Sequence, residues 1–121
     1  MIANLYRFHG HGSLRFVYRK GKNVRGQYFA IKCIINKRRK NFRASVVVSK
    51  KVSKSAVKRN RIRRRIYEVI RVNSGKIRQP FDIAIIVFSD QLVDMDHNKL
   101  ENILLDQLQQ AGVLSYKEQD V

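Results

Sequence analysis

The chain has 121 residues, of which 44% are hydrophobic, and a formal net charge of +17 at pH 7. This length and composition suit one folded domain over residues 1–121, and they exclude a disordered linker, a fibrous protein and a chain with two cores. A membrane helix needs about 20 consecutive apolar residues, and the apolar runs of this sequence are much shorter. The N-terminal segment lacks the apolar stretch of a secretory signal. The single cysteine, Cys33, has no disulfide or zinc partner, so we expect an intracellular, reducing environment.

The charge is divided sharply along the chain. Residues 1–67 contain 21 of the 26 Lys and Arg and no Asp or Glu, whereas residues 68–121 contain the other five bases and all nine acids. A surface that was basic only for solubility would mix acids among the bases. The first part of the domain is therefore predicted to form a polyanion-binding side.

The N-terminal third begins with a segment that lacks periodicity, and we expect flexible ends at residues 1–12 and 113–121. Ser13 is expected to cap a short helix that ends at Gly21. Three residues share one face of this helix at i, i+3, i+4 spacing: Leu14, Val17 and Tyr18.

Two strands are predicted next. Residues 28–36, YFAIKCIIN, alternate as a strand with one deeply buried face and one mixed face. A turn dense in positive charge, NKRRKN at 36–41, leads to a valine-rich strand at 44–49. The two strands are predicted to pair as an antiparallel hairpin.

A helix is predicted to begin near Ser55, with Ser53 and Ser55 as candidate N-caps. Four aliphatic residues form its apolar stripe: Ile62, Ile66, Val69 and Ile70. Tyr67 falls on the opposite side. The helix is predicted to end in residues 73–75, where Gly75 suits a left-handed cap.

Residues 81–88, FDIAIIVF, follow Pro80 as a near-continuous apolar run, which is typical of a strand covered on both faces. Asp94 or Asp96 is expected to cap a last helix that stops at Gly112. The inner side of that helix is predicted to carry Leu100, Ile103, Leu104 and Leu108. The predicted order is α-β-β-α-β-α, an α+β sandwich in which helices pack on one sheet.

The central helix carries six positive charges in eight positions, Lys58 to Arg65. Like charges one turn apart repel one another, and an external polyanion reverses the sign of this effect. The planar guanidinium of arginine can bind a phosphate through two hydrogen bonds. Lys50, Lys51 and Lys54 precede the helix N-terminus, whose unpaired backbone N–H groups can also bind phosphate. Nucleic acid is therefore the predicted partner.

The residues argue for binding and against bond-breaking by the protein. The acids are scattered and do not predict the converging carboxylates of a metal-dependent nuclease. His9, His11 and His97 have no evident carboxylate or nucleophile beside them. A helix-turn-helix pair, zinc ligands and heptads, which would favour duplex DNA, are not found in the sequence.

Residues 49–66, SKKVSKSAVKRNRIRRRI, resemble the signature of the bacterial ribonuclease P protein component family. That family has a strand ending in an S-K-K-like turn and a helix opening A-x-x-R-N-R-I-[KR]-R. Those motifs are here Ser49–Lys51 and Ala56–Arg64. The resemblance extends in element order from the Ser13 helix to the Leu108 helix.

The resemblance implies that a large RNA is the catalyst and removes the 5′ leader of precursor tRNA. The magnesium is expected to be held by that RNA and not by a protein site. The protein is expected to be a cytoplasmic bacterial subunit of this endoribonuclease and not to be catalytic alone. Its expected partners are ribonuclease P RNA and precursor tRNA. A membrane and a small-molecule substrate are not expected as partners. The residues expected to dock on the catalytic RNA are Lys50, Lys51, Lys54, Lys58, Arg59, Asn60, Arg61, Arg63, Arg64 and Arg65.

By the same resemblance, a cleft between the first helix and the open face of the sheet holds the single-stranded leader. The expected contacts are Leu14, Phe16, Tyr18 and Lys32. Relatives commonly carry two aromatics on the first helix at the positions of Leu14 and Tyr18, so one stacking platform is missing here and Phe16 is expected to compensate. Lys32 takes a strand position where relatives carry an aromatic, and it is expected to hold a leader phosphate.

The resemblance also implies a sheet of four strands, with a short extra strand around residues 24–27 and a left-handed β-α-β crossover. Two other classes stay open from the residues alone: a general RNA-binding or ribosome-associated module of similar build, and a DNA-binding protein. Tyr18 and Phe16 fit the packing of the first helix on the core as well as they fit base stacking.

Overall fold

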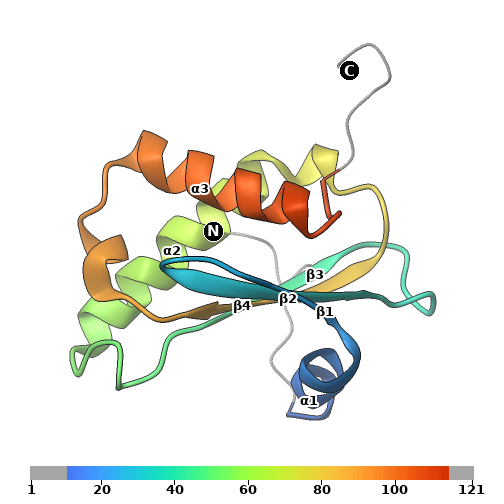
Figure 1. Cartoon of the computed structure of the whole chain (residues 1–121), viewed down its shortest axis with the longest axis horizontal. Helices are drawn as coiled ribbons and strands as arrows, with labels where there is room; N and C mark the ends of the chain where they lie inside the picture. The colour runs from blue at the N-terminus through green and yellow to red at the C-terminus, as the bar shows by residue number, and fades with distance from the viewer. Residues whose placement is uncertain (1–10, 115–121) are drawn as a thin grey trace.

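The structure, a computed structural model, describes residues 11–114, with side chains from residue 14 onward. A four-stranded sheet has α1 on one face and α2 and α3 on the other (Figure 1). The α+β fold predicted from the sequence is confirmed. In chain order the elements are α1 (His11–Lys20), β1 (Lys22–Arg25), β2 (Phe29–Ile35), β3 (Arg43–Val47), α2 (Ala56–Val72), η2 (Ser74–Lys76), β4 (Phe81–Val87), η3 (Asp90–Val93) and α3 (His97–Gln110), where η denotes a 3-10 helix.

The strand order is β1-β2-β4-β3, so the predicted hairpin of the second and third strands is wrong. β4 lies between them, antiparallel to β2 and parallel to β3. The reason is the composition of β4, which is apolar on both faces and therefore gains most from the central position. β3, α2 and β4 form the β-α-β unit, and the hand of its crossover stays a prediction from the resemblance.

β1 is the fourth strand that the resemblance implied, and it begins two residues earlier than expected. It pairs antiparallel with β2 at the edge of the sheet. Gln107 of α3 holds the turn between the two strands: its buried side-chain amide donates to the carbonyls of Val24 at 2.9 Å and Phe29 at 2.8 Å. Gly26 leaves room for this contact, because a Cβ there would lie 2.2 Å from the Gln107 Oε1.

The two faces of the sheet differ in how fully they are covered. The face toward α2 and α3 holds the main core, in which Phe29, Ile31, Ile83 and Ile85 are fully buried. Cys33 belongs to this core, and burial raises the pKa of its thiol. Of the described elements, α1 is the one that covers the other face, through a small cluster centred on Val17 and Ala84, and Figure 1 shows that α1 crosses only part of the sheet.

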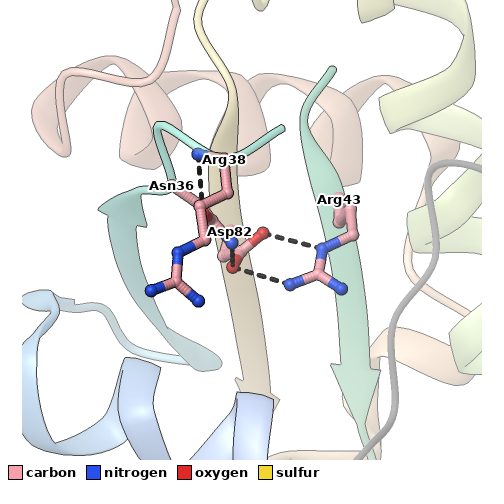
Figure 2. A network of polar contacts seen from close by, with 4 residues as sticks. All are labelled: Asn36, Arg38, Arg43 and Asp82. Atoms are coloured by element: carbon pink, nitrogen blue, oxygen red, sulfur yellow. Dashed lines mark hydrogen bonds and ion pairs between the residues drawn. The ribbon is translucent and has the colours of Figure 1, made fainter. Parts of the chain in front are cut away.

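A buried polar network joins three strands on the α1 face (Figure 2). Asp82 of β4, only 3% exposed, accepts two hydrogen bonds from the Arg43 guanidinium of β3, at 2.9 and 2.8 Å. The amide of Asn36, just after β2, donates to the same carboxylate at 3.1 Å. The carboxylate thus ties both neighbouring strands to β4 at one end of the sheet.

The registers define two ends of the sheet. Phe29 lies opposite Val87 at one end, which we call the Val87 end, and Ile35 lies opposite Phe81 at the other, the Phe81 end. Because β3 runs parallel to β4, the loop after β3 leaves from the Val87 end. The turn between β2 and β3 lies at the Phe81 end.

Most of the predicted helix caps are confirmed. Ser55 caps α2 and Asp96 caps α3, each accepting from a backbone N–H three residues on at 3.2 Å. Gly112 has a positive φ of 78°, as expected for the stop after α3. Gly75 does not form the predicted left-handed cap. Asn73 is instead the C-cap of α2, and its side-chain amide donates to the Val69 carbonyl at 2.8 Å.

Three predictions about the ends of the chain change. α1 begins at His11, so Ser13 lies inside the helix and residues 11–12 belong to an element instead of a flexible end. Val113 and Leu114 are buried in the core, and the C-terminal boundary was therefore set two residues too early. Residues 1–10 and 115–121 lie outside the described part. Among residues 11–114, no helix is long and apolar enough to cross a membrane.

Candidate nucleic-acid interface

Arg61 and Arg65, on one side of α2, hold the segment that follows β4. The Arg61 Nε donates to the carbonyl of Val93 at 2.8 Å. Arg65 donates to the carbonyls of Leu92 at 2.7 Å and Val93 at 3.0 Å, and also to that of Met95. These guanidiniums satisfy carbonyls that η3 leaves without partners, so both arginines have an internal role that their sequence pattern did not predict.

Arg59 and Arg63 hold the loop on the other side of the helix. Arg59 donates to the Ser53 carbonyl at 2.9 Å, and Arg63 donates to the Val48 carbonyl at 3.2 Å. Arg63 also donates to the side-chain oxygen of Asn60 at 2.6 Å. The arginines therefore fix the lysine-bearing loop against the start of α2.

The other cations around α2 face solvent, and Arg61 is also exposed although its Nε contacts Val93. A single long contact, 3.4 Å from the Arg64 Nε to the Asn60 carbonyl, links Arg64 to its own helix. The braced arginines keep N–H groups for a ligand, because a guanidinium has five. We call this area the α2 surface; its exposed cations are Lys50, Lys51, Lys54, Lys58, Arg61 and Arg64.

Tyr67 corrects the predicted orientation of the helix. It was placed on the outward side, but it is 3% exposed, and its hydroxyl accepts from the backbone N–H of Val46 at 3.0 Å. β3 is an edge strand, so the outer N–H of Val46 has no strand partner and needs an acceptor. Tyr67 therefore covers the edge of the sheet and is not available to nucleic acid.

Glu68 is the first acid in the sequence and lies on the exposed side of α2. It pairs with Arg71 through contacts of 2.5 to 3.1 Å. The hydrogen bond from Arg71 lowers the pKa of Glu68 to about 2, so this carboxylate is ionised at neutral pH. Among the described residues it pairs with Arg71 and not with Arg64, which lies one turn before it, so Arg64 keeps its charge for a ligand.

A groove of about 270 Å³ lies on the other face of the sheet, beside α1. We call it the groove; its walls include Tyr18, Asn23, Arg25, Ala30, Lys32 and Phe88. The Lys32 Nζ lies 5.3 Å from the centroid of the Tyr18 ring and 3.5 Å from the Tyr18 carbonyl oxygen. Partial burial raises the pKa of the Tyr18 hydroxyl, which stays neutral. A half-exposed ring and an ammonium thus share one opening.

The groove holds two of the four residues expected there. Leu14 packs on the small apolar cluster under α1, with Ile34 and Ile86. Phe16 is 45% exposed but does not line the groove. The structure therefore brings Tyr18 and Lys32 together and places Leu14 and Phe16 elsewhere on α1.

Among the groove residues that sequence analysis missed are an arginine and an aromatic, Arg25 and Phe88. Phe88 follows β4 and is 37% exposed, and the Arg25 guanidinium lies 4.3 Å from the centroid of its ring. The signal for Phe88 was an aromatic at the end of an apolar strand. Nothing local predicted Arg25, since β1 reaches Phe88 only through the pairing of β1, β2 and β4.

The histidines and acids form no metal centre in the part of the chain that the structure describes: no three His, Cys, Asp or Glu side chains gather there. The described residues therefore do not fit a dedicated protein site for the magnesium that the resemblance implied. His97 lies beside Arg64, Arg65 and Glu68 at the start of α3. The side chains of His9 and His11 lie outside the described residues.

Comparison with known proteins places this geometry in a family. The family model described as Ribonuclease P matches residues 2–112. The ribonuclease P protein component of Clostridium botulinum (strain Loch Maree) is 37% identical over 100 residues, which cover 82% of this chain and 87% of the relative. That of Lactobacillus delbrueckii subsp. bulgaricus (strain ATCC BAA-365) is 32% identical and covers 90% of this chain and 89% of the relative.

Solved structures agree with this assignment. The RNase P protein of Staphylococcus aureus superposes with a TM-score of 0.81 at 32% identity, covering 91% of this chain and 98% of that one. The RNase P protein of Thermotoga maritima superposes with a TM-score of 0.77 at 26% identity, covering 86% and 96%. A four-stranded mixed sheet with three helices, the arginine-rich α2 and matches along nearly the whole chain lead to one conclusion: this chain belongs to the bacterial ribonuclease P protein component family and is the protein subunit of an endoribonuclease.

Proposed function

We propose that the chain docks on the catalytic RNA of ribonuclease P through the α2 surface. The observation that carries the proposal is the set of exposed cations around α2, whose backbone positions are fixed by internal arginine contacts and which no acid of the first 67 residues neutralises. Preorganised cations bind phosphates without first losing conformational freedom. Arg59, Asn60, Arg63 and Arg65 contribute mainly by holding the loop and η3 in place.

We infer that the groove holds the single-stranded 5′ leader of precursor tRNA. Tyr18 offers a ring for base stacking, which contributes roughly 1 to 3 kcal/mol per base and tolerates any sequence. Lys32 supplies a positive charge beside that ring for a leader phosphate. Phe88, with Arg25 stacked on it, offers a second platform for base stacking. It would replace the aromatic residue that relatives commonly carry at the position of Leu14.

The two surfaces lie on opposite faces of the sheet, since α1 borders the groove and α2 packs on the other face. One protein molecule can therefore hold the catalytic RNA and the leader at the same time. In this proposal the RNA holds the magnesium and performs the hydrolysis, and the protein lowers the electrostatic cost of bringing two polyanions together. The setting is the bacterial cytoplasm, and neither a membrane nor a small-molecule substrate takes part.

Reconstitution tests this function. The protein is mixed with bacterial ribonuclease P RNA at low magnesium, and cleavage of a precursor tRNA with a long leader is measured. We expect cleavage to be much faster than with the RNA alone, because the protein supplies positive charge that magnesium ions would otherwise supply. No stimulation would defeat the proposal.

The same preparation separates the two alternatives. A general RNA-binding module would bind many structured RNAs and leave leader cleavage unchanged. A DNA-binding protein would prefer duplex DNA to structured RNA at matched salt. Both binding measurements use the full chain and equal ionic strength, because the salt dependence of each complex is steep.

A further inference from the structure

The turn between β2 and β3 forms a second basic area with the segment that follows α2. Residues 36–42 contain four cations and residues 73–79 contain two, and neither segment contains an acid. The two segments lie side by side, because both line a hollow of about 220 Å³ whose walls include Lys40, Phe42 and Arg78. We call these two segments the turn surface.

Within residues 14–114, no acid pairs with the four exposed cations of the turn surface that are named below. Its nearest acids in the sequence are Glu68 and Asp82, and each is paired with an arginine outside the two segments. Four of its cations are exposed and make no side-chain hydrogen bond or ion pair with the described residues: Lys37, Arg38, Lys40 and Arg78. The buried Nε of Arg39 also has no hydrogen-bond partner in the part of the chain that the structure covers. An anion from another molecule could therefore bind these groups.

The turn surface is separate from both sites described above. It lies at the Phe81 end of the sheet, whereas the Lys50 loop and the Arg25–Phe88 pair of the groove lie at the Val87 end. β2 and β4 pair over seven residues, and strands of that length span about 20 Å. This span exceeds the Debye length of about 8 Å at physiological salt, so the turn surface contributes little to binding at the other end and must make contacts of its own.

Its position points to a structured RNA. α2 leads from the Lys50 loop to the turn surface over 17 residues, about 25 Å of helix. A large folded RNA lying along α2 can reach both ends. The leader is a poor candidate, because the groove that we propose for it is lined by the Arg25–Phe88 pair at the Val87 end, whereas the turn surface lies at the opposite end of the strands.

We propose that the turn surface binds backbone phosphates of the catalytic RNA as a second anchoring point, distinct from the α2 surface and from the groove. The identity of the RNA rests on the function proposed above. The existence of the surface rests only on charge, exposure and position.

The test is the triple variant Lys37→Ala, Arg38→Ala, Lys40→Ala in the full chain. Binding of in vitro transcribed ribonuclease P RNA is measured over a range of salt concentrations. We expect the slope of log K against log salt to become shallower by about 2 to 3, since each phosphate that the variant no longer binds lowers the slope by about 0.7 to 0.9. The ratio of affinities for precursor and mature tRNA should stay as in the wild type, because the groove is untouched.

Lys99→Ala is the control for generic loss of charge, since Lys99 is exposed on α3. The proposal would be overturned if the slope of log K against log salt changed in the triple variant by no more than three times its change in Lys99→Ala. So would a loss confined to precursor tRNA, which would make the leader the occupant. Circular dichroism and thermal unfolding confirm that each variant is folded.

Lysine footprinting gives a readout without mutation. Acetylation of Lys37 and Lys40 should be slowed by bound ribonuclease P RNA, whereas that of Lys99 should not; equal reactivity with and without RNA would contradict the proposal. Failure of the function itself gives a different result. If the wild type does not stimulate leader cleavage but the triple variant still flattens the slope for structured RNA, the turn surface stands and the proposed function falls.

Discussion

At the scale of single residues, the arginines of α2 divide by what their guanidiniums contact. Arg65 donates to carbonyls that follow β4, and Arg64 faces solvent. Both occupy the same basic run, so the sequence shows that they are cationic and helical without showing which one turns inward. That difference depends on carbonyls some 27 or more residues away along the chain, which no local pattern specifies.

Arg64→Ala and Arg65→Ala should therefore fail in different ways. Arg64→Ala should make the salt dependence of RNA binding shallower by about 0.7 to 0.9, with the free energy of unfolding within about 0.5 kcal/mol of the wild type. Arg65→Ala should lower the free energy of unfolding by about 1 to 3 kcal/mol, because it leaves carbonyls without a donor. Urea unfolding and salt titrations of RNA binding measure the two effects; the same profile for both variants would contradict the division.

The aromatic residues of α1 offer a matched pair. Tyr18 lines the groove and Phe16 does not, although both are exposed to a similar degree, 40% and 45%. Tyr18→Ala should weaken binding of long-leader precursor tRNA by about 1 to 3 kcal/mol relative to mature tRNA. Phe16→Ala, the control, should change both affinities equally. If Tyr18→Ala lowered the affinity for precursor tRNA and for mature tRNA equally, Tyr18 would be a packing residue.

At the scale of elements, the helices and strands were largely predictable, because their signals are local. Ser55 and Asp96 cap the helices that their positions predicted, and the alternation of residues 28–36 predicted β2. Strand pairing was not predictable in the same way. The short connection between β2 and β3 favoured a hairpin, and only the two-sided burial of β4 explains why it separates them.

The buried Asp82–Arg43 pair helps to specify that pairing, and it can be tested in a double-mutant cycle. Asp82→Leu leaves the Arg43 charge, 15% exposed, without its carboxylate, and should lower the free energy of unfolding by about 3 to 5 kcal/mol. Arg43→Met alone should cost a similar amount. The double variant should recover much of the loss, since apolar pairs often replace buried ion pairs at little cost.

Urea unfolding of the two single variants and the double variant measures the coupling free energy. Asn36 also bonds the Asp82 carboxylate, so Asn36→Ala is the control for loss of a neutral hydrogen bond and should cost about 0.5 to 1.5 kcal/mol. Strictly additive losses in the double variant would show that the pair does not act as a unit.

At the scale of the whole molecule, the formal charge of +17 has opposite consequences for folding and for binding. Like charges repel one another within the α2 surface and within the turn surface of the free protein, and this repulsion opposes the compact state. Salt screens it and should stabilise the free protein. The same salt weakens RNA binding, because counterions released on binding gain less entropy in a concentrated salt solution.

Raising sodium chloride from 50 to 500 mM should therefore raise the melting temperature of the free protein while it lowers RNA affinity by several orders of magnitude. A gain of 1 kcal/mol corresponds to about 4 °C for a domain of this size. The triple variant at Lys37, Arg38 and Lys40 starts with less repulsion, so its melting temperature should respond less to salt. A wild-type melting temperature that fell with salt would mean that internal ion pairs such as Arg43–Asp82 outweigh the repulsion. The basic surfaces would then be stable without a polyanion, and their charge would carry no argument for RNA.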